Sequence, residues 1–227
     1  MALTDATRDE LRELADRYPQ ARSALIPMLH LVQSEEGYVS TDGLRVCAQM
    51  LGLTLAEVTA VCSFYSMFKR SPVGEHHVGV CINPLCGILG GDQIWQTLSD
   101  DLGVGNKDTT PDGKITIERI ECQAACTNAP VVTVDWEFMD QMSVESTREV
   151  VRKLGAGEPV QSTRGPAIRS FCASERSIAG FDDGLADAGG NNATTTMLAG
   201  LNAAKERGMS SPDKNGQSER DRQGDPS

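Results

Sequence analysis

Residues 78–91 read VGVCINPLCGILGG, and residues 109–132 read TTPDGKITIERIECQAACTNAPVV. The first stretch contains Cys81 and Cys86 with four residues between them, and the second contains Cys122 and Cys126 with three between them. Thiolates are soft ligands, and two short-range pairs of them suit an iron-sulfur cluster or a zinc ion. The sequence therefore predicts a metal centre around which the rest of the chain is organised.

Apolar runs with strand character lead into both cysteine pairs. Residues 76–80 (HHVGV) read as a buried strand that delivers Cys81, and the alternation of isoleucines in 115–120 marks a strand that ends at Cys122. A third strand is expected at 131–134, and Asp135 and Trp136 turn it back as a hairpin.

Amphipathic helices are expected at residues 87–102 and 143–154. Cys86 then lies at or near a helix N-terminus, where free backbone N–H groups favour an anionic sulfur. The order strand, helix, strand, strand, helix predicts a small α/β sandwich with both cysteine pairs in loops that leave strand ends.

Residues 1–72 read as a helical bundle. Helical periodicity predicts helices at about 7–18, 24–36, 41–51 and 54–63, the last of which begins with a capping box formed by Thr54 and Glu57. The aromatic segment 63–68 (SFYSMF) that follows is predicted to dock this bundle onto the next domain or to serve as an ordinary core segment.

Composition changes after Gly155. Ten of the 22 glycines follow it, together with runs of Ser, Thr, Asn and Asp, which predicts a mostly disordered tail. Residues 164–168 (RGPAI) are a candidate docking segment for a partner, and residues 196–207 a marginal helix. The predicted organisation is a helical bundle at 1–72, a cluster-binding α/β domain at 73–155 and a tail at 156–227.

Charge and composition restrict the function. A net charge of -11 with no basic stripe disfavours binding to nucleic acid. No run of about 18 apolar residues suggests a membrane span, and the N-terminal residues lack the basic and apolar regions of a secretory signal. We therefore expect a cytoplasmic location, where seven cysteines are typical of metal-binding or buried thiols and not of a disulfide framework.

The four paired cysteines leave several interpretations open. Zinc is the main rival metal, and it would make the chain a zinc-stabilised interaction module with no redox role. Three residues within a pair fit structural zinc sites less well, so the spacing favours an iron-sulfur cluster. Four buried core thiols and a dithiol oxidoreductase are further alternatives, although no CxxC motif stands at a strand-to-helix turn.

The remaining candidate ligands have other predicted roles. Cys47 and Cys62 lie on apolar helical faces and are expected in the core, whereas Cys172 is expected to be an incidental thiol in the tail. The three histidines, His30, His76 and His77, have no partner at ligand spacing. Because the chain also lacks a GxGxxG motif after a strand and a Walker motif, it is predicted to relay electrons without a substrate site of its own.

The chain resembles the 2Fe-2S (NuoE-type) subunit of the NADH-dehydrogenase module of respiratory complex I, NADH:quinone oxidoreductase. The resemblance covers about residues 15–155, including LIPMLHLVQSEEGYVS at 25–40, LTLAEVTAVCSFYSMF at 53–68 and the two cysteine stretches. At Gln123 and Ala124 this chain departs from the family, which more often has Leu and Gly there.

This resemblance implies a helical bundle followed by a thioredoxin-like 2Fe-2S ferredoxin domain, with Cys81, Cys86, Cys122 and Cys126 as the cluster ligands. It implies a flavoprotein (NuoF-type) partner that binds FMN and NADH, further peripheral-arm subunits, and a place on the cytoplasmic face of the membrane. The chain would exchange single electrons with the partner's FMN in a proton-translocating NADH dehydrogenase. The equivalent diaphorase subunit of an NAD-linked hydrogenase or formate dehydrogenase is the close alternative.

Overall fold

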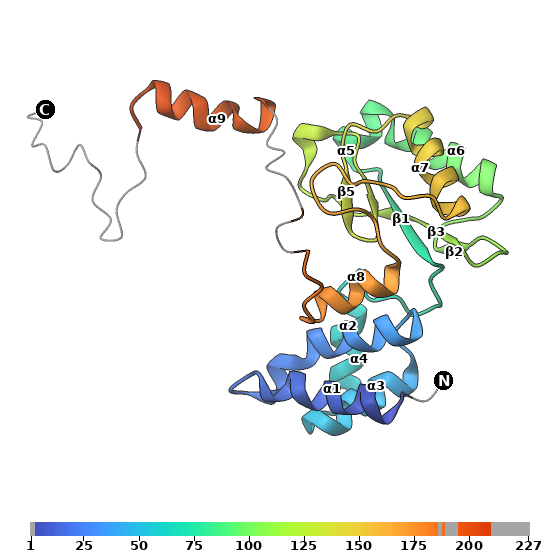
Figure 1. The fold of residues 1–227 in the computed structure, drawn as a ribbon, viewed down its shortest axis with the longest axis vertical. Helices are drawn as coiled ribbons and strands as arrows, with labels where there is room; N and C mark the ends of the chain where they lie inside the picture. The colour runs from blue at the N-terminus through green and yellow to red at the C-terminus, as the bar shows by residue number, and fades with distance from the viewer. Residues whose placement is uncertain (1–2, 186–187, 189–194, 210–227) are drawn as a thin grey trace, which may run out of the picture. The chain divides into compact units, whose positions relative to one another are not determined.

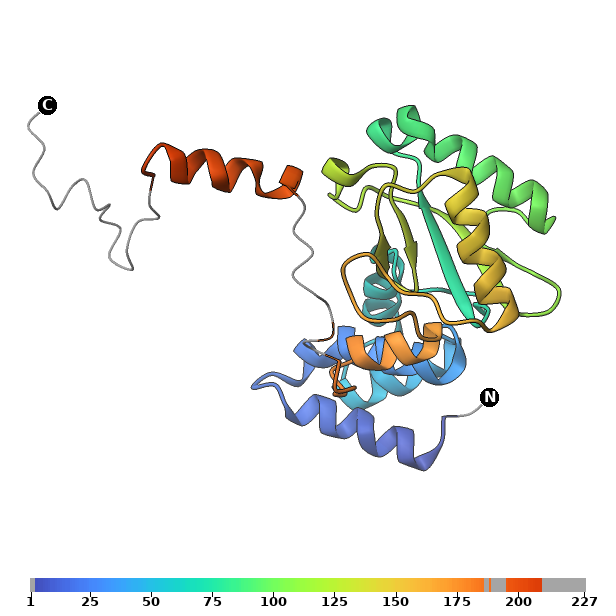
Figure 2. The same cartoon turned by 45° about the horizontal axis from the view of Figure 1, so that its top comes forward.

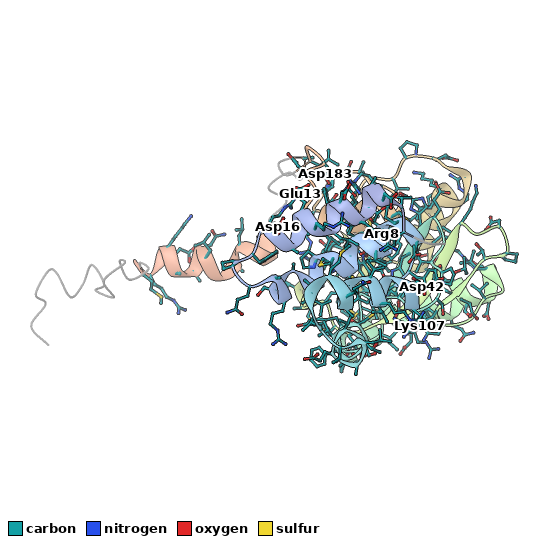
Figure 3. All side chains as sticks on the ribbon, turned by 90° about the horizontal axis from the view of Figure 1, so that it is seen from below. Arg8, Glu13, Asp16, Asp42, Lys107 and Asp183 are labelled. Atoms are coloured by element: carbon teal, nitrogen blue, oxygen red, sulfur yellow. The ribbon has the colours of Figure 1, made fainter. Side chains whose placement is uncertain are left out.

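The computed structural model describes residues 3–185, 188 and 195–209. Within them the N-terminal helices are α1 (Asp5–Asp16), α2 (Leu25–Glu36), α3 (Thr41–Leu51) and α4 (Leu55–Phe64), with the 3-10 turn η1 (Ala21–Ala24) before α2. Their apolar sides share one core that includes Leu11, Met28, Leu29, Leu44 and Val58. Exposed carboxylates such as Glu13, Asp16 and Asp42 lie on the outside of this bundle (Figure 3).

Capping residues fix the ends of these helices. The side chains of Thr4, Ser40 and Thr54 accept backbone N–H bonds at the starts of α1, α3 and α4. The capping box predicted for Thr54 and Glu57 is present. The predicted helices are confirmed, with ends that differ by one or two residues.

A mixed sheet of five strands follows the bundle. Its strands are β1 (His76–Cys81), β2 (Asp108–Thr109), β3 (Ile115–Ile120), β4 (Val132–Val134) and β5 (Glu137–Met139), in the order β2-β3-β1-β4-β5. The central strands β1 and β3 are parallel and in register from His76 opposite Ile115 to Cys81 opposite Ile120. Parallel strands end at the same edge of a sheet, so both cysteine pairs leave from one end.

The two faces of the sheet differ in chemistry because neighbouring residues of a strand point to opposite sides. Val78 and Val80 of β1 and Ile117 of β3 face a core formed with helices α6 (Asp92–Leu102) and α7 (Val144–Ala156). These two helices lie side by side over the sheet (Figures 1 and 2). The residues next to them in sequence, His77 and Glu118, are also buried and bond to each other on the opposite face.

The helix predicted at 87–102 is divided into two parts, and a separate short helix precedes it. The short α5 (Pro84–Cys86) is followed by a π-helical turn, η2 (Gly87–Gly91), and α6 begins at Asp92. Gly90, at φ 119°, makes the break between them. Cys86 is the third residue of α5, so it lies near a helix N-terminus as predicted, but in a short helix that precedes the long one.

The prediction of a mostly disordered tail from residue 156 is wrong for residues 156–185. Residues 161 and 167 form a bridge, and α8 (Phe171–Ile178) packs against α2. Phe171 is fully buried, and the buried Glu175 bonds to His30 and Trp136. These partners are far away in the sequence, so composition did not reveal them. Arg164, in the predicted docking segment, pairs with Asp140 of its own chain.

The second unit of the structure contains α9 (Thr195–Glu206), which confirms the helix predicted at 196–207. The rest of the predicted tail, 186–187, 189–194 and 210–227, lies outside the described residues. In the part of the chain that the structure describes, no helix is both long and apolar enough to cross a membrane. The predicted boundary at residue 72 falls in the segment that links α4 to β1.

The aromatic segment 63–68 divides its side chains between two environments. Phe68 is buried in the bundle core, where its ring lies 4.7 Å from that of His30. Phe64, in contrast, is 81% exposed. Lys69, directly after the segment, pairs with Glu118 of β3, so this part of the chain does join the bundle to the sheet.

Candidate metal centre

The four predicted ligands lie in two loops at the end of the sheet that points away from the helical bundle (Figures 1 and 2). Cys81 is the last residue of β1 and Cys86 the last of α5. Cys122 follows β3, and Cys126 begins the 3-10 turn η3 (Cys126–Asn128). The parallel pairing of β1 with β3 brings the two loops together.

Cys81 and Cys86 form the inner pair. Both are buried, and they pack in a small apolar cluster with Ile120 and Val131. The pKa of Cys86 is raised to about 11, chiefly by burial and further by the hydrogen bond with Cys81 and the negative charges of Cys81 and Cys126. The hydrogen bond from the Val131 N–H acts in the opposite direction. A bound iron would displace this proton, as metals do from thiol ligands.

Cys122 and Cys126 form the outer pair. Their Sγ atoms are 3.7 Å apart, and both residues are exposed. The pKa of Cys126 is raised by its hydrogen bond with Cys122 and by the negative charges of Cys122 and Cys81.

Two backbone features shape the loops. A Cβ on Gly91 would lie 2.4 Å from the Cys81 carbonyl oxygen and 2.8 Å from that of Cys86, so only glycine lets η2 pack against the inner loop. Ala124, between the outer cysteines, has a left-handed φ of 54°. This explains physically why a glycine suits that position, as the resemblance implied.

The donor set fits a 2Fe-2S cluster. Such a cluster takes four cysteine thiolates, and the site offers two neighbouring pairs, one buried and one exposed. Among the described residues, no three His, Cys, Asp or Glu side chains converge as they would on a single metal ion.

The other cysteines lie elsewhere. Cys47 and Cys62 are buried in the bundle core, as predicted. Cys172 is half-buried in α8 and not in a flexible tail, which corrects its predicted surroundings.

Each histidine has a carboxylate partner that the sequence did not indicate. His30 bonds Glu175, His76 bonds Asp135 and His77 bonds Glu118, at distances of 2.6, 2.6 and 2.7 Å. These partners lie between 41 and 145 residues away along the chain, so no local spacing signal could have found them.

Comparison with known proteins identifies the family. The model of the thioredoxin-like [2Fe-2S] ferredoxins matches residues 11–155, a range that contains both cysteine loops. The chain belongs to the thioredoxin-like [2Fe-2S] ferredoxin family. Its cofactor is accordingly a 2Fe-2S cluster, and the predicted fold class is confirmed.

Relatives with curated names extend this result. One subunit of the Mycobacterium tuberculosis NADH-quinone oxidoreductase is 48% identical over 203 residues, which cover 89% of this chain and 81% of the relative. NADH-quinone oxidoreductase subunit 2 of Thermus thermophilus is 32% identical over 169 residues, covering 73% of this chain and 93% of the relative. The chain is thus similar to these oxidoreductase subunits over most of their length.

A solved structure shares the fold. The NAD+-reducing [NiFe]-hydrogenase in its air-oxidized state matches with a TM-score of 0.52 at 17% identity, over 59% of this chain. This chain spans only 23% of the length of that hydrogenase chain. At such low identity the likeness shows the fold alone.

Proposed function

We propose that Cys81, Cys86, Cys122 and Cys126 are the four ligands of the 2Fe-2S cluster, one pair on each iron. The observation that carries this proposal is the meeting of an inner and an outer thiol pair at one end of the sheet, with 3.7 Å between the outer sulfurs. The cluster, when bound, takes up and releases one electron at a time. The chain supplies the thiolates and buries one side of the site with Ile120 and Val131.

The chain acts in this proposal as an electron-transfer subunit of NADH:quinone oxidoreductase, complex I. Identity of 48% with the M. tuberculosis NADH-quinone oxidoreductase subunit, over 81% of its length, supports this host complex. Electrons would come from the FMN of a flavoprotein (NuoF-type) subunit that binds NADH. The assembly would then lie on the cytoplasmic face of the membrane, with this chain among the peripheral-arm subunits.

The surface around the cysteines supports a permanently bound partner. Residues 81–91 and 122–134 contain no charged side chain, although 23% of the chain is charged. Three apolar side chains project there: Leu85, Ile88 and Leu89 are 44, 81 and 53% exposed. The cores of protein interfaces are depleted of charged residues and enriched in apolar ones. This uncharged surface around the cysteines therefore fits a stable contact with another subunit.

The experiment is to co-express the chain with the flavoprotein subunit of the same organism, purify the pair and add NADH. Bleaching of the cluster absorbance by NADH is the expected result. Ile88→Lys should weaken the pairing, while Ile26→Lys, on an exposed position of α2, serves as the matched control. A stable pair whose cluster stays oxidised with NADH would contradict the electron-transfer role.

An NAD-linked hydrogenase or formate dehydrogenase is the second candidate host. It is the alternative that the resemblance in the sequence left open. Purification of the native complex distinguishes the two hosts. Membrane-arm subunits would co-purify with the chain in complex I, whereas a nickel or molybdenum subunit would co-purify with it in the alternative.

A zinc-stabilised interaction module is the remaining candidate from the sequence, and metal analysis tests it. Purified protein with iron and acid-labile sulfide supports the cluster. Colourless protein with one zinc per chain would overturn the proposed function.

A further inference from the structure

Asn83 lies between the inner cysteines and contacts both cysteine-bearing segments. Its Nδ2 donates to the carbonyl oxygen of Ile120 at 3.2 Å and to Cys81 Sγ at 3.9 Å. Sulfur is a larger acceptor atom than oxygen, so the longer second distance still agrees with a hydrogen bond. Ile120 is the last residue of β3, two positions before Cys122.

The orientation of this side chain is unusual for its position. Asn83 is the N-cap residue of α5, with φ -67° and ψ 163°, where an asparagine ordinarily accepts a backbone N–H of its own helix. Its side chain makes no such bond. The amide nitrogen instead faces a carbonyl and a thiol, and its two hydrogens can serve both acceptors at once.

We propose that Asn83 is a positioning residue of the metal centre that also sets its reduction potential. This inference rests on the proposed function, because it takes Cys81 as a cluster ligand. The bond to Ile120 holds the inner loop against the strand that leads to Cys122. The bond to Cys81 Sγ places a donor on a ligand sulfur.

The expected effect on the potential has a definite sign. Reduction adds negative charge to the cluster and its sulfurs, and an N–H donor stabilises that charge. Asn83 therefore favours the reduced state and raises the potential. Removal of its amide should shift the potential to a more negative value.

Gln123 provides a matched control from the outer loop. It also carries a side-chain amide between two ligand cysteines, but its Nε2 donates to the Glu121 carbonyl oxygen at 2.9 Å. Substitution of either residue by leucine removes one amide of the site. Only the Asn83 substitution removes a described donor to a ligand sulfur.

The test is an EPR-monitored redox titration of the full chain loaded with its cluster, as wild type, Asn83→Leu, Asn83→Asp and Gln123→Leu. Both Asn83 variants should have a more negative potential than the wild type, and Gln123→Leu should stay close to it. Pulsed EPR of the reduced proteins in D2O should show a weaker exchangeable-deuteron coupling in Asn83→Leu than in Gln123→Leu or the wild type.

The outcomes separate the two proposals. A wild-type protein without a 2Fe-2S signal overturns the proposed function and this inference together. A normal wild-type signal overturns the inference alone if Asn83→Leu matches Gln123→Leu in both potential and deuteron coupling. Loss of iron in both Asn83 variants, with full loading of Gln123→Leu, supports the positioning role.

Discussion

Glu175 offers the sharpest test of how the segment after residue 156 supports the fold. Its fully buried carboxylate accepts from Trp136 Nε1 at 2.6 Å and bonds His30 Nδ1 at 2.6 Å. His30 belongs to α2 and Trp136 to the turn between β4 and β5. Glu175 of α8 thus connects the helical bundle to the sheet.

The substitution Glu175→Ala leaves both of these ring nitrogens without their partner. A buried polar group that loses its partner costs about 1–3 kcal/mol; His30 is buried and Trp136 only half-buried, so the two together should cost about 3 kcal/mol. For a domain of this size 1 kcal/mol lowers the melting temperature by about 2–4 °C, which gives a fall of about 6–12 °C. Glu175→Gln keeps the shape and neutral hydrogen bonds, and we expect about half of that fall.

The assay is thermal unfolding of the cluster-loaded chain, followed by far-UV circular dichroism. Glu13→Ala is the control, because Glu13 makes an exposed ion pair with Arg17 and should change the melting temperature little. A fall for Glu175→Ala no larger than that of the control would refute the reasoning.

Three further predictions concern truncation of the C-terminal segment, stability at acid pH and the loop of the outer cysteine pair. A chain that stops after residue 185 should keep its cluster and melt like the full chain, whereas one that stops after residue 170 loses α8 and should be strongly destabilised; equal melting curves for the two would argue against a structural role for α8. Burial alone would raise the pKa of Glu118, but the hydrogen bond from His77 and the charge of Lys69 lower it to about 2. Because the folded-state pKa lies below the unfolded value, this contribution to stability is present above about pH 4.5 and is lost as the pH falls towards 2, so urea unfolding of the apoprotein should show a steeper acid loss in the wild type than in Glu118→Gln. Ala124→Val should shorten the lifetime of the cluster absorbance, since a β-branched residue is strained at φ 54°, while Ala124→Gly should not; equal lifetimes would contradict this.

The sequence predicted the parts of the fold that have strong local signals. The helices α1 and α3 have clear apolar periodicity, and α1, α3 and α4 begin at Thr or Ser caps. The strands β1 and β3 are long enough to read as strands. The hairpin partner β5 was expected only as a turn back, and β2 was not predicted as a strand. With three and two residues, these strands are too short to show alternation.

The segment from 156 to 185 could not be predicted because its stability comes from distant contacts. The eight residues of α8 include two serines, an arginine and a glutamate, a composition that also suits an exposed loop. Only the folded chain brings Glu175 to His30, which is 145 positions away.

The candidate site was predictable in its ligands but not in its surroundings. Cysteine spacing and the flanking residues indicated the two pairs, since each pair lies within one short loop. The contact of Asn83 with Ile120 spans 37 positions, and the close approach of Gly91 to two carbonyls depends on how η2 folds back. Such features follow from tertiary structure and have no local pattern.

Reduced-state EPR of the wild type beside Cys81→Ser, Cys122→Ser and Cys172→Ser tests the central claim most directly. Each of the first two variants removes one proposed ligand, whereas Cys172 lies in α8 outside the site. The account predicts a 2Fe-2S signal in the wild type and in Cys172→Ser, and its loss or gross alteration in the two ligand variants. An unaltered signal in Cys81→Ser or Cys122→Ser would contradict the assignment of the metal centre.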